Sequence, residues 1–220
     1  MKPTLFISDL HLEDAVPGRT GWLAAFLAGP ATEASALYIL GDLFEFWIGD
    51  DALSPTAQHV AKGLGALGAQ GVKTFFMHGN RDFLIGERFC ARVGATLLPD
   101  PSVIEEQDRR LLLMHGDSLC TRDVDYQAFR AQARSAEWQE QALSQPLETR
   151  RAMAANLRAM SMDAGSRKAA DIMDVTERDV VAAMRDAGVD TLIHGHTHRP
   201  ARHEDSAGER WVLGDWEATG

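Results

Sequence analysis

The chain has 220 residues, of which 45% are apolar, and this is enough to bury a full core, most simply in one domain. Its formal net charge of −10 argues against a general nucleic-acid binder, because such proteins carry a basic face that releases counterions from phosphate. The apolar runs are too short to span a bilayer and the N-terminus lacks the apolar core of a secretory signal, so we expect a cytoplasmic protein.

Six short apolar runs each end in a cluster of Gly, Asp, Asn or His, a pattern typical of buried strands followed by loops. In chain order they lie at 3–11, 36–46, 73–82, 110–117, 190–198 and 209–216. Helix-like stretches at 21–28 and 56–69 separate the first three runs. This alternation predicts a layered α/β fold. The five tryptophans are scattered along the chain, and core packing is their expected role.

A long helical segment interrupts the strand series. Helix-like stretches lie at 126–134, 137–143, 149–160 and 167–175, with almost no strand signal between residues 121 and 176. The strand pattern then resumes at 190–198. We therefore predict a helical cap at 121–176, inserted within a single domain of residues 1–220 and lying over the strand ends.

Ligand-type side chains follow five of the predicted strands. They are Asp9 and His11 in a D-x-H motif, Asp42, Asn80, His115, and the pair His196 and His198 in an H-x-H motif. Alternate residues of an extended chain point the same way, so each paired motif offers two ligands to one small volume. Carboxylate, imidazole and amide groups without thiolate suit divalent ions such as Mn²⁺, Fe²⁺, Zn²⁺ or Mg²⁺. Any one motif is more often an ordinary strand end, but the whole set predicts a two-metal site for phosphoryl chemistry.

The order D-x-H, GD, GN, HG and GHTH resembles the calcineurin-like metallophosphoesterase superfamily from Asp9 to His198. The stretches "LGDLFEFWIGDD", "HGNRDFLIG", "MHGDSLCTRDVDYQAFR" and "VLGDW" are further similar to its branch that hydrolyses UDP-2,3-diacylglucosamine in lipid A biosynthesis. The resemblance implies a four-layer α/β sandwich, in which two β-sheets are flanked by helices, with an inserted helical cap. It also implies that water attacks the α-phosphorus, giving UMP and 2,3-diacylglucosamine 1-phosphate, usually with two Mn²⁺ ions.

The resemblance also assigns residues. One ion would be held by Asp9, His11, Asp42 and His198, and the other by Asp42, Asn80, His115 and His196, with Asp42 as the bridge. Substrate contacts would come from Asn80, Arg81, Asp123, Ser161, Lys168 and His196, and the catalytic set would be Asp42, Asn80, Arg81 and His196. The implied partners are the nucleotide-activated diacylglucosamine lipid and the cytoplasmic face of the inner membrane, to which the protein would bind peripherally. Neither nucleic acid nor an obligate protein partner is expected.

Arg81 stands where two-metal phosphoesterases usually carry a histidine that passes a proton. Proton transfer matters most when the departing oxygen is strongly basic, whereas a pyrophosphate expels a weakly basic phosphate ester. A permanently charged guanidinium can bind two phosphate oxygens, so Arg81 favours a diphosphate substrate. The alternative is that Arg81 only pairs with Asp82 or another acid.

The segment 150–168 is basic within an acidic chain. It contains five basic residues, Arg150, Arg151, Arg158, Arg167 and Lys168, against the single acid Asp163. Methionine and leucine at near-helical spacing predict a helix, one face of which would contact acyl chains while another would contact anionic groups. The alternative is that these apolar residues pack on the core and the arginines are solvated. For the whole chain, another two-metal phosphoesterase and a non-catalytic scaffold remain the alternative functions.

Overall fold

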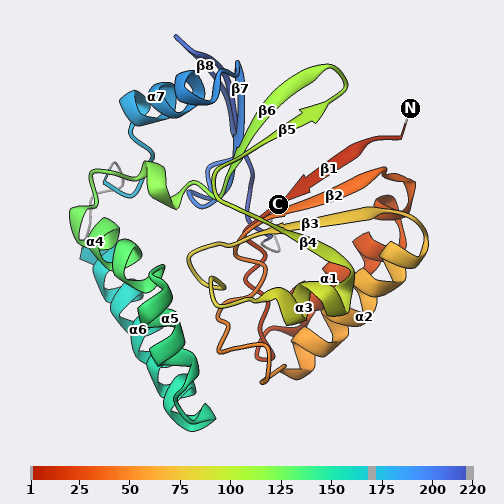
Figure 1. Ribbon diagram of the computed structural model, residues 1–220, viewed down its shortest axis with the longest axis vertical. Helices are drawn as coiled ribbons and strands as arrows, with labels where there is room; N and C mark the ends of the chain where they lie inside the picture. The colour runs from red at the N-terminus through yellow and green to blue at the C-terminus, as the bar shows by residue number, and fades with distance from the viewer. Residues whose placement is uncertain (1, 168–171, 217–220) are drawn as a thin grey trace.

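The computed structural model describes residues 2–167 and 172–216. Its first sheet is parallel, with the strand order β1-β2-β3-β4. The strands are β1 (Thr4–Ile7), β2 (Ala36–Leu40), β3 (Lys73–Met77) and β4 (Ala95–Leu98). They are connected by α1 (Pro17–Ala28), the 3-10 turn η1 (Pro30–Glu33), α2 (Pro55–Ala69) and α3 (Glu87–Val93). The three α-helices lie together on one face of this sheet (Figure 1).

The second sheet is mixed and has the order β5-β6-β7-β9-β8. Its strands are β5 (Ser102–Glu106), β6 (Arg109–Met114), β7 (Thr191–His194), β8 (Ala201–Asp205) and β9 (Gly208–Val212). The strands β6, β7 and β9 are parallel, while β5 and β8 pair antiparallel at the two edges. The helix α7 (Glu177–Ala187) directs Val180 and Met184 into an apolar cluster with Leu112 and Leu192 of this sheet.

Apolar contacts between the two sheets form the centre of the molecule. One cluster joins Tyr38, Leu40 and Met77 of the first sheet to Leu111, Leu113 and Ile193 of the second. All five residues of β2 are buried, because helices cover one face and the other sheet covers the opposite face. The expected α/β fold of two sheets flanked by helices is confirmed. The parallel strands of both sheets deliver their carboxyl ends to a common region, where the loops carry the ligand-type residues.

A helical arm lies between β6 and β7 in the chain. It contains the 3-10 turn η2 (Asp117–Leu119), α4 (Val124–Ala133), α5 (Ala136–Leu143) and α6 (Leu147–Arg167). In Figure 1 these three α-helices lie side by side and project away from the sheets. Asp123 and Ser135 cap α4 and α5 by accepting the backbone N–H groups of Tyr126 and Trp138. No helix of the described residues is both long and apolar enough to cross a bilayer.

Several sequence expectations were incomplete or wrong. The patterns did not predict α3, α7, β4, β5 or β8, which are short or rich in charged residues. The helix expected over 167–175 does not extend through its described end, because residues 172–175 form turns and irregular chain before α7. The prediction that the tryptophans pack in the core was also wrong for two of them, since Trp22 is 42% exposed and Trp211 is 44% exposed.

Candidate two-metal site

Three of the five loops that carry the ligand-type residues have unusual backbone conformations. Asp9, His11, Asp42, His196 and His198 all have positive φ angles, between 49° and 68°. Only two other non-glycine residues of the described chain, Gln107 and Asp108, share this property. Left-handed conformations are unfavourable for residues with a Cβ and are concentrated at functional sites. The extended chain expected through D-x-H and H-x-H is therefore wrong, because sharp turns bring these side chains together.

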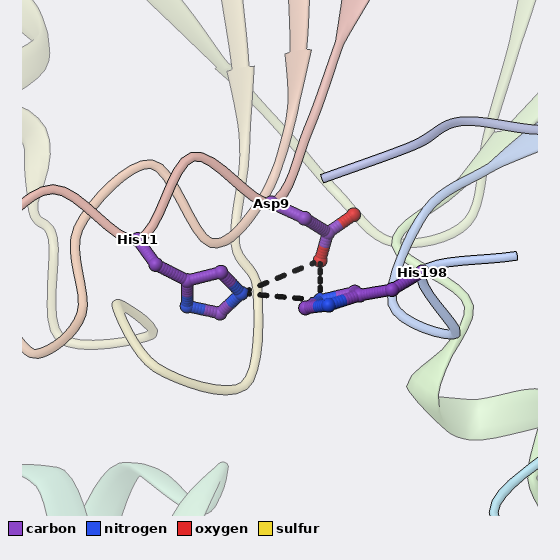
Figure 2. Close-up of side chains that lie close together, drawn as sticks. All are labelled: Asp9, His11 and His198. Atoms are coloured by element: carbon purple, nitrogen blue, oxygen red, sulfur yellow. Dashed lines mark hydrogen bonds and ion pairs between the residues drawn. The ribbon is translucent and has the colours of Figure 1, made fainter. Parts of the chain in front are cut away.

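Asp9, His11 and His198 form the first cluster of ligand-type atoms. Figure 2 shows the three side chains directed toward one point. Asp9 Oδ1 lies 3.4 Å from His198 Nε2 and 4.0 Å from His11 Nε2, and the two imidazole nitrogens are 3.2 Å apart. These distances suit three groups that share one cation.

Asn80, His115 and His196 form the second cluster. Asn80 Oδ1 lies 2.9 Å from both His115 Nε2 and His196 Nδ1. Asp42 lies between the clusters, with Oδ2 3.8 Å from His11 Nε2 and Oδ1 3.8 Å from His115 Nε2. The structure thus brings all seven predicted ligand residues together, and Asp42 directs one oxygen toward each group.

The electrostatics of the clusters fit bound cations. Asp9 Oδ1 is buried and has no hydrogen-bond partner among the described residues, an arrangement that a cation would complete. Burial opposes the charging of His115, but the carboxylates of Asp42, Asp117 and Asp9 outweigh burial and raise its pKa to about 9. These carboxylates therefore favour positive charge at the position of His115. Burial and the neighbouring charge of His115 lower the pKa of His196 to about 4, which keeps its imidazole in the neutral form that binds metals.

The Asp82 side chain connects the loop after β3 to the loop after β2. Its fully buried carboxylate accepts the backbone N–H groups of Gly79 and Leu43 at 2.9 and 2.8 Å, and those of Asp42 and Phe44 at 3.3 Å. The loops approach so closely that a Cβ on Gly79 would lie 2.0 Å from Asp42 Oδ1. This contact explains why a glycine precedes Asn80.

Arg81 lies beside this site and forms no ion pair with an acid among the described residues, although, against the effect of burial, its charge helps that of His11 to lower the pKa of the Glu45 carboxyl. Asp82 accepts backbone donors, and among the described residues the Arg81 guanidinium forms no ion pair. Its Nε is buried without a hydrogen-bond partner, while its backbone N–H donates to Asp42 Oδ1 at 2.8 Å. The alternative that Arg81 only pairs with Asp82 is therefore wrong. Its guanidinium remains available for an anion.

A cavity of about 560 Å³ opens between the metal-type clusters and the helical arm. Its polar lining includes Asn80, Arg81, Asp123, Ser161 and His196. Its apolar lining includes Phe46, Trp47, Leu84, Phe129, Met153, Leu157 and Met160. Five of the six expected substrate contacts therefore share one cavity. The sixth, Lys168, lies outside the described residues.

Sequence reasoning missed the residues that dock α4 beside the site. Asp117 is fully buried and accepts hydrogen bonds from the Tyr126 hydroxyl at 2.5 Å and from Arg130 Nε at 2.8 Å. The Tyr126 ring stacks on His196, with centroids 6.1 Å apart. Arg134 donates to the Gly79 carbonyl at 2.9 Å. The motif "HGD" pointed to an acid at position 117, but spacing alone does not distinguish a buried acid that accepts several hydrogen bonds from a residue in a turn.

Two arginines of α6 also differ from expectation. Arg150 is 7% exposed and binds both oxygens of Asp51 as well as the Ile48 carbonyl. Arg158 pairs with Glu45 at 2.5 Å. Both therefore bind groups of the α/β body, so neither is simply a solvated or anion-facing charge. Arg151 is exposed.

Comparisons with known proteins agree with this geometry. The family model for calcineurin-like phosphoesterases matches residues 2–200. The chain is 53% identical to the UDP-2,3-diacylglucosamine hydrolase of Cellvibrio japonicus, over 99% of this chain and 92% of that protein. It is 52% identical to the hydrolase of that name from Chromohalobacter salexigens, over 97% and 88% of the two chains. The corresponding protein of Escherichia fergusonii is 51% identical, over 99% and 92%.

Proposed function

This chain belongs to the calcineurin-like phosphoesterase family, and we propose that it hydrolyses the pyrophosphate bond of UDP-2,3-diacylglucosamine to UMP and 2,3-diacylglucosamine 1-phosphate. It is a metal-dependent hydrolase of lipid A biosynthesis. The observation that carries the assignment is the Arg81 guanidinium, which forms no ion pair among the described residues, beside seven converged ligand-type residues in a chain at least 51% identical to hydrolases of that name. A scaffold without activity would have no need to retain this set.

The family uses divalent metal ions, and we propose two Mn²⁺ ions for this chain. Asp9, His11, Asp42 and His198 would hold one ion, and Asp42, Asn80, His115 and His196 the other. When bound, such a pair activates water and neutralises charge on phosphoryl oxygens. Two observations support these assignments: Asp9 Oδ1 is buried and accepts no hydrogen bond from the described residues, and the pKa of His196 is lowered to about 4.

The chain's own groups then orient the diphosphate. Arg81 extends from the residue after Asn80 and can bind two phosphate oxygens with its planar guanidinium. His196 and Asn80 lie 2.9 Å apart at the same end of the cavity, which limits where the reacting phosphorus can lie. Attack at the α-phosphorus expels a phosphate ester of low basicity, so charge binding by Arg81 replaces proton donation by a histidine.

The helical arm supplies room for the lipid. We propose that residues 121–176 act as a cap within a single domain of residues 1–220, with Asp123, Ser161 and Lys168 contacting the substrate. The apolar lining of the cavity, including Phe46, Leu157 and Met160, suits acyl chains, and methionine adapts to flexible ones. A small nucleotide or a simple phosphodiester would leave this apolar surface unused.

We also propose that the cap rests on the cytoplasmic face of the inner membrane, where the lipid substrate resides. Val124 and Met160 are 71% and 67% exposed on α4 and α6, and Arg151 adds an exposed positive charge. Exposed apolar side chains beside basic ones favour an anionic lipid surface. The acidic chain as a whole gives no support to nucleic acid as a partner.

The direct test measures UMP release from detergent-dispersed UDP-2,3-diacylglucosamine, with Mn²⁺ and with a chelator. We expect release only with metal, and loss of release in Asp42→Ala and His196→Ala. Asp186→Ala, which removes an exposed aspartate on α7, is the matched control and should retain activity. Turnover of a cyclic nucleotide without UMP release from the lipid would favour another phosphoesterase. In labelled water, label in the sugar phosphate and not in UMP would contradict attack at the α-phosphorus.

A further inference from the structure

Glu45 has a backbone position set by pairing between two of the site loops. His11 N donates to the Asp42 carbonyl at 3.0 Å, Leu12 N donates to the Leu43 carbonyl at 3.0 Å, and Glu45 N donates to the Leu12 carbonyl at 3.1 Å. Leu12 and Phe44 form an isolated parallel bridge within this ladder. The start of the Glu45 side chain is therefore held in register with His11.

The Glu45 carboxylate contacts two cationic or polar groups from distant parts of the chain. It is 6% exposed, with Oε2 2.9 Å from His11 Nδ1 and Oε1 2.5 Å from Arg158 Nε. Both are ion-pair contacts, since neither His11 Nδ1 nor Glu45 Oε1 has a hydrogen bond of regular geometry among the described residues. The other nitrogen of His11, Nε2, is directed to Asp42 and His198 at 3.8 and 3.2 Å. His11 thus lies between the Glu45 carboxylate and the first ligand cluster. Such outer carboxylates set the tautomer and ring orientation of ligating histidines.

Arg158 belongs to α6, and this helix has a second attachment to the same loop. Arg150 binds Asp51 and the Ile48 carbonyl, whereas Arg158 binds Glu45. Eight residues separate the two arginines, which is about 12 Å along a helix. All three acceptors belong to the segment 42–51, which begins with the proposed bridging ligand Asp42. The helix therefore docks on the loop that carries part of the metal site.

We propose that Glu45 is a positioning residue with two separate contacts, one that orients His11 and one that docks cap helix α6. One oxygen holds the imidazole toward the metal cluster, while the other binds Arg158 and so places α6 over the cavity. The inference rests on the proposed metal site, although neither contact requires substrate.

Three variants separate the two contacts of Glu45. Glu45→Ala removes both contacts, Glu45→Gln keeps an acceptor for His11 but loses the charge for Arg158, and Arg158→Gln removes only the helix contact. Arg151→Gln, at an exposed position on the same helix, is the matched control. Thermal unfolding of each variant confirms that the chain is folded before the measurements.

The first measurement is Mn²⁺ binding to the full chain by calorimetry, without substrate. We expect Glu45→Ala to weaken binding by about 10- to 100-fold, the usual effect of removing an outer carboxylate. Arg158→Gln and Arg151→Gln should bind Mn²⁺ within about threefold of the parent, because they leave the His11 contact in place. Unchanged Mn²⁺ affinity in Glu45→Ala would overturn the link to His11.

The second measurement is amide hydrogen exchange in peptides from 150–161. We expect Glu45→Gln and Arg158→Gln each to speed exchange by about 2- to 5-fold, since Arg158 is partly exposed and such pairs are weak. The exchange rate of the double variant Glu45→Gln/Arg158→Gln should equal that of either single variant, because both substitutions remove the same contact. Two results would overturn the contact with α6. One is an exchange rate in the double variant that equals the product of the two single effects, and the other is an increase in Arg151→Gln as large as that in Arg158→Gln. Neither measurement depends on UMP release, so failure of the proposed reaction is separately detectable.

Discussion

Arg81 donates its backbone N–H to the Oδ1 of Asp42 at 2.8 Å. This hydrogen bond fixes where the Arg81 side chain begins relative to the proposed bridging carboxylate. The residue that distinguishes this site from one with an acid histidine is therefore positioned by a candidate metal ligand. The proposed anion-binding residue and the proposed bridging ligand therefore lie on two adjoining loops of the site.

Replacing Arg81 with histidine should reduce UMP release by about 100- to 1,000-fold, because the loss of one preorganised charge contact in a transition state has this magnitude. Manganese content, measured by elemental analysis, should be unchanged, since the backbone bond to Asp42 does not need the side chain. Arg81→Lys keeps the charge without the planar pair of donors and should retain part of the activity. Full activity in Arg81→His would contradict the proposed role.

The buried His194 predicts loss of stability in mild acid. Burial lowers the pKa of His194 from 6.5 to about 4, against a hydrogen bond with the Gly195 carbonyl that raises it. The unfolded chain therefore binds this proton near pH 6.5, whereas the folded chain does not until about pH 4. Stability that is present above pH 6.5 is consequently lost as the pH falls toward 4.

Urea unfolding in the presence of a chelator at pH 7 and pH 5 measures this effect. Between the two values, the free energy of unfolding of the parent should fall by about 2 kcal/mol more than that of His194→Gln. The parent and His59→Gln should show equal pH dependence, because His59 is exposed on α2 and serves as the control. Equal slopes for the parent and His194→Gln would show that His194 does not resist protonation in the folded chain.

Membrane binding of the cap should depend on its exposed apolar residues. Val124→Glu combined with Met160→Glu should weaken binding to phosphatidylglycerol-containing vesicles by about 10-fold, because the change removes apolar contact and adds negative charge. Sedimentation with the vesicles measures the bound fraction. Val103→Glu combined with Trp22→Glu, at 41% and 42% exposed positions on β5 and α1, adds the same two negative charges outside the cap; this matched control should bind as the parent does. Equal loss in both proteins would point to net charge alone.

Much of the architecture followed from local pattern. Apolar runs that end in Gly, Asp, Asn or His located the strands that precede the site, and the helical segment after residue 121 was visible from composition alone. The short strands β5 and β8 were missed because charged residues interrupt their apolar pattern at the sheet edges. Their pairing depends on neighbouring strands rather than on intrinsic preference. The ligand roles and the division into domain and cap remain predictions.

Motifs alone predicted the chemical types at the strand ends, namely Asp9, His11, Asp42, Asn80, His115, His196 and His198, together with the arginine after Asn80. The type and the order of these residues can be read from short motifs without any knowledge of the fold. Three features become visible only in the folded chain: Arg81 forms no ion pair among the described residues, Arg150 is buried on Asp51, and Glu45 lies between His11 and Arg158. These contacts join residues 34 to 113 positions apart, and such contacts arise from the packing of loops, which spacing does not encode.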